Sequence, residues 1–182
     1  MSIEHWQLDS SSSGIHFAVR HLVLAKTRGR FSRWSGTLMV PGGDFSRATV
    51  DVVIDAASID TGVARRDDHL RSAEFLDVNR YPNIIFSARR VSAEPDGSLR
   101  VVGALTIRDV TRHVSLAVLP NGRTLEPWGK QRVGFLATAT IERRDFGFSG
   151  NPALDAGGLV IGQRIEVEIE VEAVKQPAVR AA

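Results

Sequence analysis

Hydrophobic and polar residues alternate one by one along much of the chain. The alternation is strictest at 165–173, where isoleucine and valine alternate with glutamate, and it recurs at 50–54, 99–107 and 133–141. Successive side chains of a β-strand point to opposite faces, whereas an amphipathic helix repeats every 3.6 residues. The pattern therefore predicts half-buried antiparallel strands, each with one apolar and one solvated face.

Turn residues divide the alternating segments into about eight strands of an all-β domain. The strands are expected at roughly 14–24, 28–40, 48–59, 83–94, 98–108, 111–120, 131–142 and 160–174. Turns are expected at Pro41-Gly42-Gly43-Asp44, Pro95-Asp96-Gly97 and Pro120-Asn121-Gly122, with a weaker signal at 108–111. Proline presets φ near −65°, and glycine and asparagine tolerate positive φ.

Sequential strands joined by short turns predict a meander. An even number of long strands avoids exposed edges best by closing on itself, which predicts an eight-stranded antiparallel β-barrel. A sandwich of two sheets is the alternative, and it would normally use shorter strands and Greek-key crossings.

One segment departs from the strand pattern. Residues 61–78 carry a loose helical spacing of apolar positions, which predicts one or two short helices over one end of the barrel. Asp60 or Thr61 is expected to cap the first helix, and Tyr81-Pro82 bars its continuation. The glycine-rich stretch 146–158 is expected to be a long loop at the rim. We expect a single domain over 1–175 and a frayed tail over 176–182.

The composition is that of an ordinary globular protein, with 43% hydrophobic and 24% charged residues in 182. The chain has no cysteine, which excludes disulfides, thiolate metal sites and a cysteine nucleophile. The polar start of the chain lacks the features of a signal peptide, and no apolar run reaches the length of a membrane span. The sequence predicts a soluble, cytoplasmic protein without stable membrane insertion.

The positive charge is unevenly distributed. The net charge is only +2, yet no acid occurs between Asp9 and Asp44, an interval that contains Arg20, Lys26, Arg28, Arg30 and Arg33. A nucleic-acid site would require more charge and interleaved aromatic residues, so no nucleic-acid partner is expected. A solvated basic face is the simplest interpretation.

Motifs of common enzymes are absent: there is no GxGxxG, P-loop, GxSxG or HExxH. No two of the five histidines have the i, i+4 spacing of a helical metal pair, and His16 and His21 are expected on opposite faces of one strand. Histidines from different strands can also converge on a metal ion inside a barrel, so a histidine-based metal protein or enzyme stays an alternative. Residues 65–69, Arg-Arg-Asp-Asp-His, are explained as the start of a helix, with acids near its positive end. We therefore predict no catalytic residues, no metal and no cofactor.

The barrel interior is the remaining candidate site. Eight strands enclose either a packed core or one small ligand, and the mixture of small and aromatic residues fits both. If a ligand is bound, its expected apolar lining comprises Phe17, Val19, Phe31, Trp34, Leu38, Leu70, Phe75, Phe86, Leu105, Phe135, Ala137 and Phe146.

Motifs along nearly the whole chain resemble the YceI-like family of lipocalin-like, polyisoprenoid-binding barrels. The matching stretches are IHFAVRHL (15–22), RGRF (28–31), FSRWSGTL (31–38), IDAASIDTG (54–62), RRDDHLRSAEFLDVNRYPNIIF (65–86), GALTIRDVT (103–111), PWGKQRVGFLATATIERRDFGF (127–148) and IGQRIEVEIEVEAVK (161–175). Asp109 departs from the glycine of many relatives and alters only a turn. Some members of the family are exported with leader peptides, but we do not expect an exported location for this protein.

The resemblance implies a non-catalytic carrier or storage protein for a long isoprenoid lipid, of the polyprenyl phosphate or isoprenoid quinone type. Arg28 and Arg30 have equal strand parity and are the candidates for a phosphorylated head group; solvation or pairing with acids is their alternative role. A homodimer that hides an open mouth is a further expectation. The alternative hypothesis for the function is a stress-related structural or interaction barrel with a packed interior.

Overall fold

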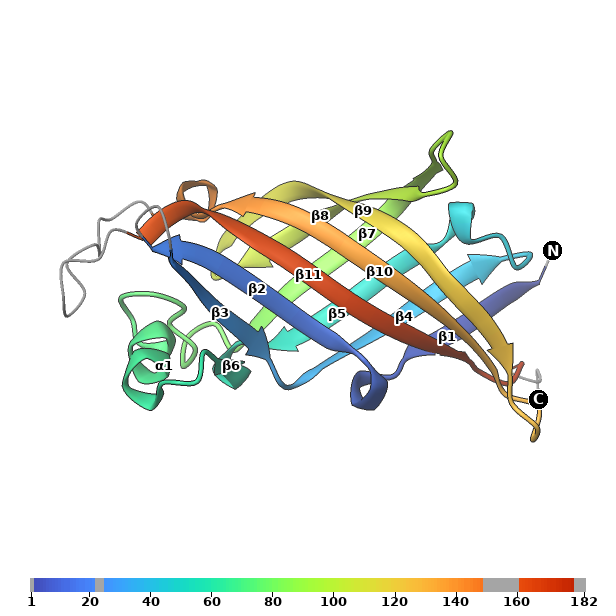
Figure 1. The fold of residues 1–182 in the computed structure, drawn as a ribbon, viewed down its shortest axis with the longest axis horizontal. Coiled ribbons are helices and arrows are strands. Elements are labelled where there is room, and N and C mark those ends of the chain that lie inside the picture. The colour runs from blue at the N-terminus through green and yellow to red at the C-terminus, as the bar shows by residue number, and fades with distance from the viewer. Residues whose placement is uncertain (1, 22–24, 149–160, 179–182) are drawn as a thin grey trace.

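The computed structural model describes residues 2–21, 25–148 and 161–178 (Figure 1). Within these residues the strands are β1 (Ile3–Leu8), β2 (Gly14–His21), β3 (Ala25–Phe31), β4 (Trp34–Pro41), β5 (Thr49–Asp55), β6 (Ile59–Asp60), β7 (Asn83–Ala93), β8 (Leu99–Ile107), β9 (Val110–Leu125), β10 (Gln131–Glu142) and β11 (Ile161–Lys175). The helices are α1 (Ala64–Arg71) and the short 3-10 turns η1 (Ser10–Ser12), η2 (Phe45–Arg47), η3 (Ala56–Ser58) and η4 (Arg143–Phe146).

The sheet closes into an antiparallel barrel of eight strands. The ring runs β1-β4-β5-β7-β8-β9-β10-β11, and the pairing of β1 with β11 closes it. Beyond the end of β1, strand β11 continues its pairing with β2, which pairs with β3. This confirms the predicted barrel and excludes the sandwich.

Two positions of the ring are filled by interrupted strands. β1 and β2 both pair with β11 and are separated by η1, and β3 and β4 are separated by a break at Ser32 and Arg33. The prediction of a single strand over 28–40 is therefore wrong. Strand β1 was not predicted, because only Trp6 and Leu8 show the apolar alternation there. The break leaves β3 paired with β6 at Arg30 and Phe31 instead of continuing along β5.

β9 is longer than expected because Pro120-Asn121-Gly122 is not a turn between strands. It forms an irregularity in the pairing of β9 with β10, and the chain turns only at 126–130. Gly122 adopts a φ of 94°, and an added Cβ on Gly134 would lie 2.9 Å from the carbonyl oxygen of Asn121. Glycine thus permits a bulge here, where the sequence pattern also fits a hairpin turn. The other turns, at 41–44, 95–97 and 108–109, lie where they were expected.

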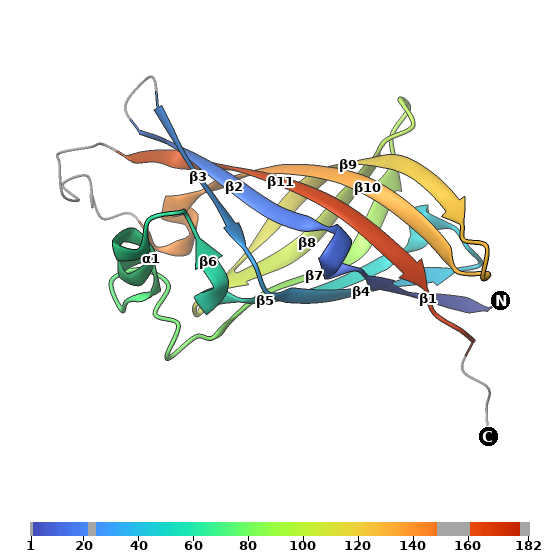
Figure 2. The same cartoon turned by 60° about the horizontal axis from the view of Figure 1, so that its bottom comes forward.

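One α-helix, α1, lies at the end of the barrel opposite the start of β1 (Figures 1 and 2). The predicted cap is wrong: Val63 precedes the helix and makes no side-chain cap hydrogen bond. Instead, Asp67 in the first turn accepts hydrogen bonds from the backbone N–H and the hydroxyl of Thr61. No helix in the described ranges has the length and apolar character needed to cross a membrane.

The end of the barrel at β1 is packed with side chains. The rings of Trp6, Phe45 and Phe135 pack in series with tilted planes, and their centroids are 5.4 and 5.3 Å apart. Val40 and Ala173 are fully buried in the same cluster. This packing closes one end of the interior with the protein's own residues.

A charged cluster ties the strand ends together near this packed end. Arg132 on β10 donates hydrogen bonds to Asp9 (2.8 Å), Glu172 (3.3 Å) and Glu126. The bond from Arg132, assisted by Ser11, lowers the pKa of Asp9 from 3.8 to about 2. Ionised Asp9 thus joins the β1–β2 junction to β10.

The lowered pKa of Asp9 predicts a stability that depends on acid pH. Between about pH 4 and pH 2 the unfolded chain binds a proton that the folded chain does not, so stability falls as the pH falls through this window. Denaturant unfolding of the wild type and of Asp9→Asn should show a shallower pH dependence for the variant between pH 4 and 2. Asp109→Asn, in an exposed turn, should follow the wild type; parallel curves for wild type and Asp9→Asn would contradict this role of Asp9.

The tail and the rim loop are only partly covered by the described residues. The backbone N–H of Gln176 donates to the carbonyl of His5 at 2.8 Å, so the start of the expected tail is hydrogen-bonded to β1. Residues 179–182 lie outside the described residues, as do 149–160 of the expected loop. Phe146 belongs to η4 and not to a loop.

Candidate ligand-binding site

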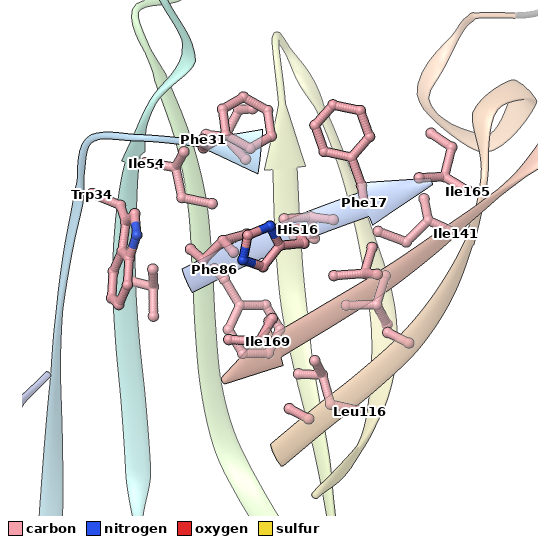
Figure 3. A pocket seen from close by; sticks show the side chains of 18 of the residues that line it. His16, Phe17, Phe31, Trp34, Ile54, Phe86, Leu116, Ile141, Ile165 and Ile169 are labelled. Carbon is pink, nitrogen blue, oxygen red and sulfur yellow. The ribbon is translucent and has the colours of Figure 1, made fainter. Parts of the chain in front are cut away.

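An apolar cavity of about 370 Å³ occupies the barrel interior between the packed end and α1. Pockets that hold small molecules typically measure about 300–1,000 Å³, and a single water needs only about 15 Å³. The alternative of a solidly packed interior is therefore wrong. Figure 3 shows part of the lining, including Phe17, Phe31, Phe86, Ile141 and Ile169.

The strand alternation that defines the fold also makes the cavity. On β11 the inward positions are Ile165, Val167, Ile169 and Val171, all of which line the cavity, while the glutamates between them face outward. The same alternation is found on the other strands of the ring, except that a bulge between Ala88 and Arg90 shifts it by one residue on β7, where Phe86 and Val91 both line the cavity. A closed sheet thus collects every apolar face on one enclosed surface.

Glycines make room for two of the aromatic rings. An added Cβ on Gly29 would lie 2.3 Å from the ring of Phe17, and one on Gly103 would lie 2.6 Å from the ring of Phe86. Both distances are shorter than any tolerable contact. The tip of each ring therefore occupies the space over a glycine of the neighbouring strand, where a larger residue would clash with it.

Helix α1 and the segments after α1 and η4 contribute apolar residues at the α1 end. Leu70, Phe75 and Leu76 line the cavity, as does Phe148. The rings of Phe75 and Phe148 stack with centroids 6.5 Å apart, and the guanidinium of Arg108 lies 4.2 Å from the centre of the Phe148 ring. The two segments are thereby joined through one aromatic contact.

Two arginines are the charged side chains among the described residues of the lining. Arg66 donates to the hydroxyl and the carbonyl of Thr61, at 2.7 and 2.8 Å. Arg143 is only 7% exposed, donates to the carbonyl of Gly162 at 2.9 Å, and has its pKa lowered by burial. Neither arginine was predicted from the sequence to border the cavity, because Arg66 was explained as part of a helix start and Arg143 lies at the edge of a strand.

Eleven of the twelve residues expected to line a ligand lie against the cavity: Phe17, Val19, Phe31, Trp34, Leu38, Leu70, Phe75, Phe86, Leu105, Phe135 and Ala137. Phe146 does not; it is 1% exposed and packs in the core cluster behind the wall. That these residues bind a ligand stays a prediction.

The two expected head-group residues lie on the outer face of β3. Thr27, Gly29 and Phe31 alternate with them and are partly buried, whereas Arg28 and Arg30 are exposed. Arg30 pairs with Asp60 at 3.4 Å. Neither arginine lines the cavity, and the alternative role, solvation or pairing with acids, fits their positions.

The histidines do not converge in the described part of the chain. No group of three histidine, aspartate or glutamate side chains is placed there to hold a metal ion. His16 borders the cavity but is exposed, and the side chain of His21 lies outside the description. His69 contacts Glu74 at 2.7 Å and packs edge-on against Phe75. Asp68 pairs with Arg71 on the exposed side of α1, as expected of a structural helix segment.

The fold and the cavity define a class: a closed antiparallel barrel with an apolar interior large enough for a small molecule. The model of the YceI-like domain matches residues 6–173. The chain belongs to the YceI-like family.

Relatives and solved structures agree with this assignment. The chain is 37% identical over 162 residues to protein YceI of Salmonella newport, a match that covers 89% of this chain and 81% of the relative. The crystal structure of a YceI protein from Campylobacter jejuni superposes with a TM-score of 0.72 at 27% identity, over 87% of this chain and 90% of that one. A polyisoprenoid binding domain from Saccharophagus degradans, implicated in plant cell wall breakdown, has the same fold, with a TM-score of 0.66 at 16% identity over 92% and 97%.

The open interior predicts that Ala137, a small inward residue of β10, tolerates enlargement. Ala137→Phe should reduce uptake of an apolar ligand about tenfold or more, while changing the free energy of unfolding by less than about 1 kcal/mol, because the ring enters empty space instead of overpacking a core. Displacement of the neutral fluorophore N-phenyl-1-naphthylamine and denaturant unfolding measure the two quantities. Thr138→Phe, on the outer face of the same strand, is the matched control and should leave uptake unchanged. Equal loss of uptake and stability in Ala137→Phe would indicate a packed core.

Proposed function

We propose that this protein binds the hydrocarbon chain of a long isoprenoid lipid in its barrel cavity, as a carrier or storage protein without catalysis. The observation that supports this most is the continuous apolar lining of the cavity, to which β2, β5, β7 and β11 all contribute. Such a surface excludes water and offers an isoprenoid chain contact on all sides.

The hydrophobic effect supplies enough free energy for such binding. Burial of about 500 Å² of hydrocarbon contributes about 12 kcal/mol at roughly 25 cal/mol per Å². Association costs of about 4 kcal/mol or more leave about 8 kcal/mol, which corresponds to micromolar affinity. The chain of the ligand therefore needs no directional contact, which fits walls built from aliphatic and aromatic side chains.

The comparisons support the choice of an isoprenoid. The domain from Saccharophagus degradans that shares this fold is described as polyisoprenoid binding. A methyl-branched chain also suits a lining in which branched side chains such as Ile54 and Val52 lie beside aromatic rings such as Trp34 and Phe86.

The described lining suits binding better than acid–base chemistry. It includes no carboxylate, and the guanidinium groups of Arg66 and Arg143 cannot serve as general bases because arginine stays protonated. His16, Thr27 and Thr61 are the other polar residues of the described lining, and the remaining residues are apolar and exclude water.

Analysis of co-purified lipid tests the proposal. Protein purified without detergent should yield isoprenoid lipids on organic extraction and mass spectrometry, and delipidated protein should release N-phenyl-1-naphthylamine when geranylgeraniol is added. Ala137→Phe should yield less lipid than Thr138→Phe from the same cells, since only the former narrows the cavity. Recovery of straight-chain fatty acids alone, or of empty protein that fails to bind geranylgeraniol, would contradict the proposal.

A further inference from the structure

The two ends of the cavity differ in the residues that line them. The polar residues of the described lining belong to β2, β3, η4 and the segment from Thr61 through α1. The elements that make the packed end, β1, β4 and η2, contribute only apolar residues to the described lining: Leu8, Trp34, Leu38 and Phe45. An isoprenoid lipid has one polar end and one end of pure hydrocarbon, so its hydrocarbon end fits the packed end best.

Phe45 reaches the packed end from a turn and not from a strand of the barrel wall. It is the first residue of η2, between β4 and β5. Asp44 caps this turn by accepting hydrogen bonds from the backbone N–H and the hydroxyl of Ser46, at 3.0 and 2.6 Å. The backbone N–H of Ala48 donates to the carbonyl of Phe45 at 3.2 Å. The turn is thus held by its own hydrogen bonds, which fix the backbone that carries the Phe45 ring.

The Phe45 ring separates the cavity from the residues behind it. It packs against Phe135, which also lines the cavity, with ring centroids 5.3 Å apart. Its other neighbours do not line the cavity: the Trp6 ring centroid lies 5.4 Å away, and the Arg123 guanidinium lies 5.1 Å from the centre of the Phe45 ring. Trp6 is buried in the core cluster and Arg123 is exposed at the surface. The Phe45 ring therefore forms the boundary at which the cavity ends.

A hydrocarbon chain gains affinity with each isoprene unit only while the cavity has room for that unit. Every unit that enters removes apolar surface from water. A unit that meets a close-packed cluster cannot enter without displacing side chains, which costs free energy. The further units of a longer chain then stay outside the cavity, and they add nothing to the affinity.

We infer that Phe45 limits the length of the isoprenoid chain that the barrel accepts, with the hydrocarbon end of the chain against its ring and with Trp6 and Phe135 packed around that ring. This inference rests on the proposed function and adds to it a selection among chains by length. It depends on the apolar wall alone and is therefore independent of the polar end of the lipid.

A mixture of prenols of increasing length tests the inference. Delipidated protein is incubated with an equimolar series of prenols that lengthens unit by unit from farnesol to solanesol, freed of unbound lipid, and its bound alcohols are quantified by mass spectrometry. In the wild type the bound amount should rise with chain length to a maximum and fall about tenfold or more for longer chains. Phe45→Ala should move this maximum to longer chains by about one isoprene unit, because the ring that it removes occupies about as much space as one unit.

Two further variants keep the test decisive. Phe45→Leu retains an apolar side chain and should give a smaller shift in the same direction, and it replaces Phe45→Ala if thermal unfolding shows that Phe45→Ala is not folded. Leu125→Ala removes an exposed side chain of β9 that does not line the cavity, and it should leave the maximum unchanged.

The outcomes separate this inference from the proposed function. An unchanged maximum in a folded Phe45 variant, or equal binding of all chain lengths by the wild type, would overturn the inference while leaving the proposed function standing. Failure of the wild type to bind any of the prenols would instead overturn the proposed function.

Discussion

The closure of an alternating sheet is the constraint on which the rest of the structure depends. Each strand has one apolar face, and pairing of β1 with β11 turns all of these faces toward one enclosed volume. Eight strands enclose an interior that inward side chains can fill or that can hold one small ligand, depending on the size of the inward residues. Trp6, Phe45 and Phe135 fill the space at one end, and the remainder stays open.

The open part of the interior is preserved by small residues in specific places. Gly29 and Gly103 let Phe17 and Phe86 lie against the wall, and Ala137 leaves space in the middle of β10. A protein selected only for stability would gain by filling this volume, since buried contacts and reduced voids both favour the folded state. The retention of an apolar cavity is therefore best explained by an occupant.

The sequence predicted the barrel well because period-two alternation is a direct consequence of strand geometry. Eleven of the twelve residues expected to line a ligand lie against the cavity, although the sequence left open which face of each strand is interior. The exception is Phe146, which follows the end of β10 in a 3-10 turn. β1 was missed because two alternating apolar residues are too few to stand out. The bulge at Gly122 could not be distinguished from a turn, since both require glycine at positive φ. Arg66 was not predicted to border the cavity, because the residues of a short helix that face the barrel depend on how the helix packs, which a local pattern does not determine.

The central claim is that the interior of the barrel is an unfilled apolar space that holds a hydrocarbon chain. A high-resolution crystal structure of the protein with geranylgeraniol tests this most directly. A bound hydrocarbon chain should appear as continuous density inside the barrel, between Phe86 and Ile169. An interior filled by rearranged side chains, with the lipid absent or on the outer surface, would contradict it.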